Sequence, residues 1–152
     1  MKKWAQALFG RCNDQQAQEV VASINHLDPA TLWRQIGEGM ALLLVDVRPA
    51  AEYEDGHIAG ARLLPQPVIL ERCDELPRDR RLVLVCRAGG ISQATCEQLA
   101  KQGFRQLANL RGGMQAWKEA GLPYVVAGCS SAIRAAATTT ADGMVTAATS
   151  AQ

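Results

Sequence analysis

The segment Leu82-Val83-Leu84-Val85-Cys86-Arg87-Ala88-Gly89-Gly90-Ile91-Ser92 decides the fold of this chain. It opens with four consecutive aliphatic residues, a run typical of a strand buried on both faces of a parallel sheet. The strand ends at Cys86, and the glycines that follow predict a short loop. Ser92 is a favourable N-cap for a helix over residues 93–102. We therefore predict that a strand, a loop and a helix start meet at one thiol.

This location suits a reactive cysteine. In open α/β sheets, ligands bind outside the carboxyl ends of the strands, where helix N-termini present unpaired N–H groups and favour negative charge. We expect Cys86 to form its thiolate readily, with several backbone N–H groups of the loop directed at the sulfur and with Arg87 as a nearby cation. The alternative is a buried cysteine that only fills space, and the glycine-containing loop argues against it.

Further motifs lie on both sides of this loop. They are Leu44-Val45-Asp46-Val47-Arg48, Glu52-Tyr53, Gly56-His57-Ile58-Ala59-Gly60-Ala61, Gly103-Phe104, Leu110-Arg111-Gly112-Gly113, Ala116-Trp117 and Gly121-Leu122-Pro123. Together with the loop from Cys86 to Ser92, these segments resemble, in content and in order, the signatures of rhodanese-like sulfurtransferases. The resemblance covers residues 26–126.

The resemblance implies an enzyme that moves sulfane sulfur from a donor such as thiosulfate to cyanide or a thiol, through a persulfide on Cys86. This chemistry needs neither a metal nor an organic cofactor. The substrate-binding residues would be those of the loop, Arg87, Ala88, Gly89, Gly90, Ile91 and Ser92. The other polar signature residues are expected to support the site by charge pairing and hydrogen bonding rather than by catalysis: Asp46, Arg48, Glu52 and His57.

One departure from the family lies at Ile91, where many single-domain relatives carry arginine. The predicted anion site is therefore less positive than theirs, which lowers the expected efficiency with a doubly charged donor but leaves the persulfide chemistry in place.

Three other functions compete with this one. A related group of phosphatases uses a Cys-x5-Arg loop, but Ser92 occupies the position of that arginine and supplies no bidentate cation for a phosphoryl group. A non-catalytic partner-binding module is the second, and the presence of Cys86 argues against it. The third is a relay that passes sulfur to a protein thiol, and the sequence does not separate it from an enzyme with small-molecule acceptors.

Composition narrows the class of protein. The chain has 152 residues, 48% of them hydrophobic, and a net charge of +1, which suits one soluble domain and predicts neither a nucleic-acid nor a membrane partner. Its five cysteines are an odd number and lack CxxC pairs, so we expect neither a disulfide framework nor a zinc site. Without disulfides, the expected location is the reducing cytoplasm. No apolar run approaches the roughly 18 residues of a membrane span.

The rest of the chain predicts alternating strands and helices, an α/β architecture with a parallel sheet. The resemblance implies about five strands with helices on both faces. Strands are expected over 41–47, 61–64, 82–85 and 104–110, and helices over 29–36, 49–55, 68–73, 93–102 and 114–120. Asp28 should cap the first helix, with Pro29 at its first position. Trp33, Cys96 and Trp117 are expected in the core.

Residues 1–25 are predicted as an N-terminal arm, 26–126 as the rhodanese-like domain and 127–152 as a tail. From Ala127 onward the composition shifts to Ala, Thr, Ser and Gly, with few large apolar residues. Such a segment buries too little surface to offset the entropy lost on ordering, so we predict a mostly disordered tail.

A chain that ends at Ala127 is expected to melt within a few degrees of the full-length protein, because the removed residues offer almost no core. Thermal unfolding of both chains, followed by circular dichroism in one buffer, measures this. A larger fall in melting temperature would mean that the tail packs on the domain.

Overall fold

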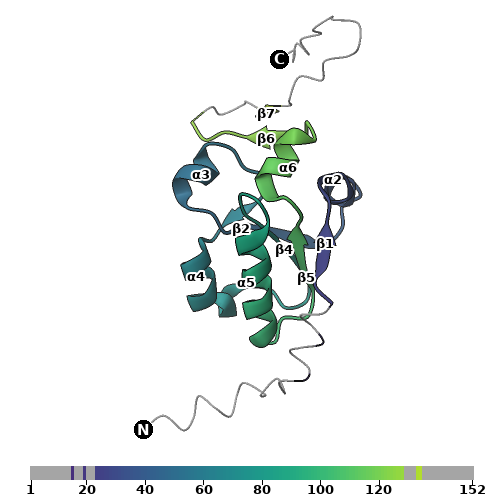
Figure 1. Ribbon diagram of the computed structural model, residues 1–152, viewed down its shortest axis with the longest axis vertical. Helices are drawn as coiled ribbons and strands as arrows, with labels where there is room; N and C mark the ends of the chain where they lie inside the picture. The colour runs from purple at the N-terminus through teal and green to yellow at the C-terminus, as the bar shows by residue number, and fades with distance from the viewer. Residues whose placement is uncertain (1–14, 16–18, 20–22, 129–132, 135–152) are drawn as a thin grey trace, which may run out of the picture.

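A parallel sheet forms the centre of the fold in the computed structural model, which describes residues 15, 19, 23–128 and 133–134. Its strands are β1 (Asn25–Leu27), β2 (Leu42–Asp46), β3 (Arg62–Leu63), β4 (Arg81–Val85) and β5 (Leu107–Leu110). Their order is β1-β5-β4-β2-β3, and every pairing among them is parallel (Figure 1). The predicted five-stranded α/β architecture is confirmed, and β4 occupies the middle of the sheet.

Helices cover both faces of the sheet, as expected. They are α2 (Pro29–Gly37), α3 (Ala50–Glu54), α4 (Gln66–Glu71), α5 (Gly90–Lys101) and α6 (Gly113–Glu119), with a 3-10 turn at Cys73–Glu75. One face carries α4 and α5, and the other carries α2, α3 and α6 (Figure 1). Asp28 caps α2 as predicted, because its carboxylate accepts a hydrogen bond from the Thr31 N–H at 2.9 Å.

Strand β4 contributes to two hydrophobic cores through the alternation of its side chains. Leu82 and Leu84 pack toward α4 and α5, whereas Val83 and Val85 pack toward α2 and α6. All four are at most 1% exposed, which explains the continuous aliphatic run in the sequence. The alternation places Cys86 on the side of α4 and α5.

Helix α5 begins earlier than predicted. The N-cap is Gly89, at φ 94°, rather than Ser92, which lies buried inside the first turn. The left-handed conformation of Gly89 turns the chain directly from the loop into the helix, a conformation that glycine adopts without steric cost. The prediction of Ser92 as the N-cap was therefore wrong. Its hydroxyl does not cap the helix and instead contacts Cys86 and Asn109, as described below.

Two other elements differ from the predictions by more than one residue. Strand β5 starts at Leu107 rather than at Phe104, because Gly103 and Phe104 still donate backbone hydrogen bonds to the last turn of α5. Helix α4 starts at Gln66, two positions before Val68, and ends at Glu71. Pro67 fits this first turn because the N–H groups there have no partner within a helix.

The two predicted core tryptophans have different surroundings. Trp117 on α6 is fully buried, but Trp33 on α2 is 44% exposed and meets Trp117 edge-on, with ring centroids 6.1 Å apart. The prediction for Trp33 was wrong because Leu32 points into the core, and its neighbour along a helix is rotated by about 100° from that direction.

Short strands at both ends of the domain were not predicted. β1 pairs with β5 and is too short to show a periodic pattern. β6 (Tyr124–Val125) pairs antiparallel with β7 (Ile133–Arg134), which lies in the predicted tail, so the chain ending at Ala127 also loses this pairing. Apart from β7 and residues 127–128, the predicted tail lies outside the described residues, as does most of the arm 1–25.

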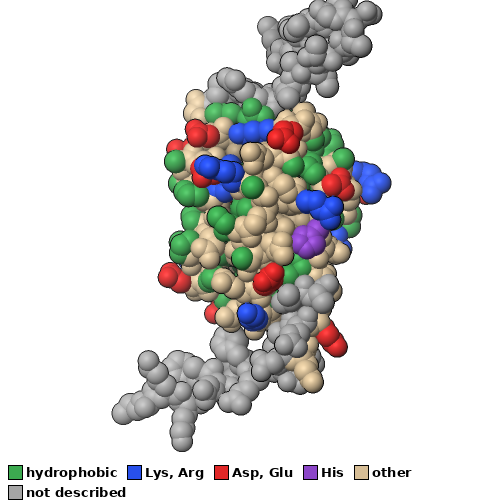
Figure 2. All heavy atoms as spheres, in the orientation of Figure 1, with side chains coloured by type: hydrophobic (Ala, Val, Ile, Leu, Met, Phe, Trp, Pro, Cys, Tyr) green, Lys and Arg blue, Asp and Glu red, His purple; other side chains and the backbone are tan. Residues whose placement is uncertain are grey.

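The surface carries charges of both signs. On the face shown in Figure 2, Lys and Arg side chains are interspersed with Asp and Glu side chains, in keeping with the net charge of +1. Within the described ranges, every helix is too short or too polar to cross a lipid bilayer.

Candidate active site

Cys86 follows directly after the central strand and lines a cleft of about 370 Å³. The residue is only 2% exposed, so reagents reach its sulfur through this cleft. The lining residues follow β2, β3 and β4 or lie on α3 and at the starts of α4 and α5: Val47, Arg48, Pro49, Glu52, Pro65, Gln66, Pro67, Cys86, Arg87 and Ile91. This is the expected location, at the carboxyl ends of parallel strands.

Two polar groups approach the sulfur. The backbone N–H of Gly89 donates a hydrogen bond to Cys86 Sγ at 3.0 Å, and Ser92 Oγ lies 3.1 Å from the same atom. The sequence predicted several backbone donors, but among the described contacts of this loop only one backbone N–H reaches the sulfur. The second group is a side chain, which the earlier start of α5 turns inward.

Asn109 belongs to the site and was not predicted. It lies on β5, is 3% exposed, and accepts a 2.6 Å hydrogen bond from Ser92 Oγ through its Oδ1 atom. Its Nδ2 atom donates to the Gly89 carbonyl at 3.1 Å and lies 3.4 Å from His26 Nδ1. The available signal in the sequence was a polar residue within a strand whose other residues are apolar, since such a group needs a buried partner.

Helix α6 holds the backbone of the cysteine. The N–H groups of Met114 and Gln115 donate to the carbonyls of Cys86 and Arg87 at 2.8 and 3.0 Å. Gly113 has φ 55°, and a Cβ atom there would overlap the backbone of both residues. The loop and the N-terminus of α6 therefore pack as closely as two backbones allow.

Asp46 and Arg48 form a buried ion pair beside the cleft. Arg48 is 6% exposed and Asp46 is fully buried, and Arg48 Nη2 lies 2.6 Å from Asp46 Oδ2. The same Nη2 atom donates to the Gly56 carbonyl at 2.9 Å, and the Arg48 backbone N–H donates to Asp46 Oδ1 at 3.0 Å. These bonds tie the end of β2, which lines the cleft, to the segment after α3.

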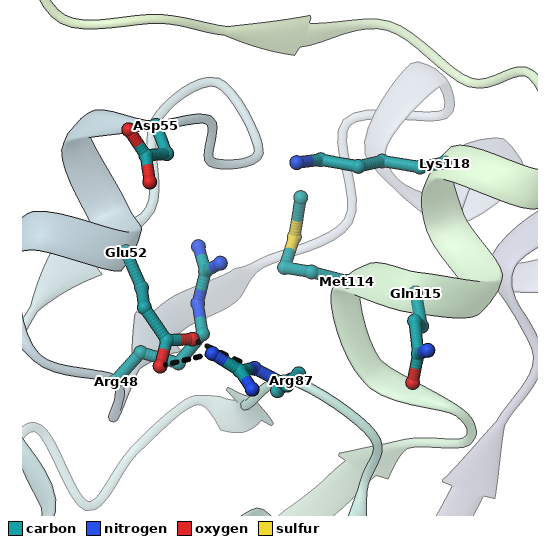
Figure 3. Close-up of a pocket in the computed structure, with 7 residues that line it drawn as sticks. All are labelled: Arg48, Glu52, Asp55, Arg87, Met114, Gln115 and Lys118. Atoms are coloured by element: carbon teal, nitrogen blue, oxygen red, sulfur yellow. Dashed lines mark hydrogen bonds and ion pairs between the residues drawn. The ribbon is translucent and has the colours of Figure 1, made fainter.

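Arg87 and Glu52 form a second ion pair, in which Arg87 Nη2 lies 2.9 Å from Glu52 Oε1. The Arg87 side chain is 71% exposed, so the pair adds little stability and is free to exchange partners. Both residues and Arg48 also line a neighbouring cavity of about 360 Å³ (Figure 3). The other lining residues of that cavity are Asp55, Met114, Gln115 and Lys118.

The remaining predicted residues take different positions. Ile91 is 58% exposed on the rim of the cleft, and Ala88 and Gly90 are exposed in the loop. His57 does not line either cavity; its ring stacks on Tyr53 at a centroid distance of 3.6 Å, and its Nδ1 atom lies 2.8 Å from the Tyr53 carbonyl oxygen. The geometry therefore brings Cys86, Arg87 and Ile91 together with Arg48 and Glu52, and leaves His57 outside.

The cysteines of the described segments are free thiols: Cys73, Cys86 and Cys96. Cys96 on α5 is fully buried, as predicted, and burial raises the pKa of its thiol to about 12. It therefore stays protonated at neutral pH and is a poor nucleophile. No group of three or more candidate metal ligands occurs in the part of the chain that the structure describes.

Comparison with known proteins agrees with this geometry. The family model of the rhodanese-like domain matches residues 28–120. A sulfurtransferase from Allochromatium vinosum is 40% identical over 102 residues, which is 67% of this chain and 95% of that protein. The thiosulfate sulfurtransferase GlpE from Shewanella oneidensis is 35% identical over 100 residues, which is 66% of this chain and 98% of that protein.

A solved structure shows the same fold. The crystal structure of a rhodanese-related protein from Thermoplasma volcanium superposes with a TM-score of 0.61 at 30% sequence identity. The match covers 67% of this chain and 98% of that one.

Replacing Gly113 with alanine is expected to lower the free energy of unfolding by about 1–3 kcal/mol, the usual range for forcing an extra carbon into a packed site. The added Cβ atom meets the backbone of Cys86 and Arg87, at a φ that alanine disfavours. Urea unfolding measures the change.

Gly90→Ala is the matched control, because a Cβ atom there meets nothing within 4 Å. Its free energy of unfolding should stay level or rise slightly. Equal losses in the two variants would contradict the close packing of α6 against the loop.

Proposed function

This chain belongs to the rhodanese-like family, and from that premise we propose that it is a sulfurtransferase that carries sulfane sulfur as a persulfide on Cys86. The donor is a sulfane-sulfur compound such as thiosulfate, and the acceptor is a thiol or cyanide. The observation that carries the proposal is the position of Cys86 Sγ, which receives the Gly89 N–H at 3.0 Å and lines an open cleft.

In the first half-reaction, the Cys86 thiolate attacks the outer sulfur of thiosulfate. A bond forms between Sγ and that sulfur, the sulfur–sulfur bond of thiosulfate breaks, and sulfite leaves with the electron pair. Arg87, at the mouth of the cleft, offers a cation to the sulfonate part of the donor. To do so, it exchanges its exposed ion pair with Glu52 for the donor.

In the second half-reaction, the acceptor attacks the outer sulfur of the persulfide. A bond forms between acceptor and sulfur, the persulfide bond breaks, and Sγ leaves as the thiolate, so the enzyme returns to its first state. The Gly89 N–H stabilises this leaving group because it already points at Sγ. The reaction requires no metal and no organic cofactor.

The site is less suited to phosphate. A Cys-dependent phosphatase places an arginine where this chain has Ser92, and Ser92 is buried with its hydroxyl between Cys86 and Asn109. A serine there cannot supply the planar cation that holds a phosphoryl group in two places. A module that only binds partners would not need a cysteine held in this geometry.

We further propose a cytoplasmic protein, because the described cysteines are free thiols and a reducing compartment keeps them so. Its partners would be a sulfur donor and an acceptor, either a small molecule or a protein thiol.

Cys86→Ala should abolish thiosulfate:cyanide sulfur transfer, because the atom that carries sulfur is gone. The measurements are formation of thiocyanate and intact mass after incubation with thiosulfate. Wild type should show a species heavier by one sulfur, which cyanide removes.

Single replacements of Cys73 and Cys96, both buried away from the cleft, should leave transfer and added mass largely intact, as should those of Cys12 and Cys129. Wild-type protein should not turn over an aryl phosphate. Sulfur transfer that persists in Cys86→Ala, or phosphatase activity that depends on Cys86, would overturn the assignment. A folded wild-type protein with neither activity would indicate a binding module.

Arg87→Ala should raise the Michaelis constant for thiosulfate by about tenfold, equivalent to about 1.4 kcal/mol, with a smaller effect on turnover, because Arg87 binds the donor and performs no chemistry. Glu52→Gln should have the opposite effect on this constant, because it removes the carboxylate that competes for Arg87. Steady-state kinetics at fixed cyanide measure both. Losses confined to turnover in Arg87→Ala would contradict the binding role.

A further inference from the structure

The two groups that approach Cys86 Sγ are both held by a single side chain on the neighbouring strand. Asn109 accepts from Ser92 Oγ at 2.6 Å and donates to the carbonyl of Gly89, the residue whose N–H reaches the sulfur, at 3.1 Å. Asn109 is 3% exposed and Ser92 is fully buried, so water does not compete for these bonds. Asn109 does not contact the sulfur itself, and it acts through these neighbours.

The surroundings fix the orientation of the Asn109 amide. If the amide were turned over, its oxygen would face the Gly89 carbonyl oxygen, an acceptor against an acceptor. A carbonyl oxygen has no proton to donate, and that of Gly89 also accepts from the Gln93 N–H at 3.2 Å. Oδ1 must therefore face Ser92.

This orientation decides where the Ser92 proton points. The hydroxyl has one proton and three acceptors in reach, namely Asn109 Oδ1 at 2.6 Å, Cys86 Sγ at 3.1 Å and the Gly89 carbonyl at 3.2 Å. The contact with Asn109 is the shortest, and a separation of 2.6 Å between two oxygens requires a proton between them. Ser92 then presents a lone pair to the sulfur, which suits a neutral S–H donor.

We propose that Asn109 is a positioning residue that directs the Ser92 proton away from Cys86 and so opposes ionisation of the thiol. When Cys86 loses its proton to solvent, the Ser92 hydroxyl must rotate before it can donate a hydrogen bond to the thiolate. That rotation breaks its bond to Asn109 and leaves two buried oxygens facing each other without a proton.

This inference rests on the proposed function, because opposing ionisation is useful only if Cys86 acts as a nucleophile. A thiolate that forms too easily is a weaker nucleophile, and the best attacking thiol ionises near the ambient pH. The Gly89 N–H and the start of α5 favour the thiolate, and Asn109 opposes them. In the persulfide the negative charge moves from Sγ to the outer sulfur, and the Ser92 proton returns to Asn109.

Other ionisable groups around Cys86 are unchanged in the variants proposed below. Arg48, Glu52 and Arg87 line the same cleft, Asp46 pairs with Arg48, and Cys96 on α5 is close enough to sense the charge of Cys86. The Nδ1 atom of His26 on β1 lies 3.4 Å from Asn109 Nδ2, so His26 is the ionisable group whose contact changes when Asn109 is replaced.

The test is the pH dependence of Cys86 alkylation by iodoacetamide, resolved to the Cys86 peptide by mass spectrometry. Asn109→Leu and Asn109→Ala both free the Ser92 hydroxyl to donate to the sulfur. In both, the midpoint should fall by about one pH unit, a tenfold change in the thiol–thiolate equilibrium. A role in stability alone predicts the opposite sign, since a loosened loop would weaken the Gly89 hydrogen bond and raise the midpoint.

Two controls isolate the path through Ser92. Thr95→Val removes another buried hydroxyl of α5, which donates to the Ile91 carbonyl at 2.8 Å, and should leave the midpoint in place. In a Ser92→Ala background, Asn109→Leu should no longer lower the midpoint, because the hydroxyl that it releases is absent. A persistent shift there would assign the effect to His26 or to the loop and overturn the proposal.

Asn109 variants whose midpoint is unchanged or higher would also overturn it. If the Asn109→Leu variant does not melt cooperatively, the sign of the change in midpoint is taken from Asn109→Ala, whose side chain is smaller. Alkylation does not require sulfur transfer, so a failure of the proposed function appears separately, as the lack of a persulfide on wild-type protein.

Discussion

The site depends on the close contact between two backbones, the loop after β4 and the first turn of α6. Met114 and Gln115 donate to the carbonyls of Cys86 and Arg87, and Gly113 leaves room for the contact because it has no Cβ atom. With these carbonyls held by α6, the loop keeps the Gly89 N–H directed at the sulfur. The Gly89 N–H of a loop held in this way is already in place when charge develops on Sγ, which is the condition for effective electrostatic stabilisation by that donor.

The order of the strands explains which residues surround the sulfur. β4 lies between β2 and β5, and parallel strands present their carboxyl ends at one edge. From β2 come Asp46 and Arg48, which fix one wall of the cleft, and from β5 comes Asn109. Residues far apart in sequence therefore meet at one cysteine because of the topology of the sheet.

Sequence reasoning succeeded where the signal is local and failed where it depends on tertiary contacts. The aliphatic run of β4, the loop after it and the Asp28 cap of α2 are visible in neighbouring residues and were predicted. The start of α5 was missed because Gly89 competes with Ser92 for the N-cap, and the backbone conformation decides between them. Asn109 was missed because its partner Ser92 is 17 residues away and its role is visible only when β5 lies beside β4.

The charges around the cleft suggest why hydrogen bonds matter so much here. Among the residues that line it, Arg48 is paired with Asp46 and Arg87 with Glu52, and Ile91 adds no charge. Each of these two cations thus has a carboxylate partner. The sulfur of Cys86, a residue only 2% exposed, is approached by two neutral groups, the Gly89 N–H and the Ser92 hydroxyl, and hydrogen bonds are stronger in a buried environment. The Ser92 hydroxyl, which has one proton and lies within reach of both Asn109 and Cys86, is the neutral donor on which our proposal for Asn109 rests.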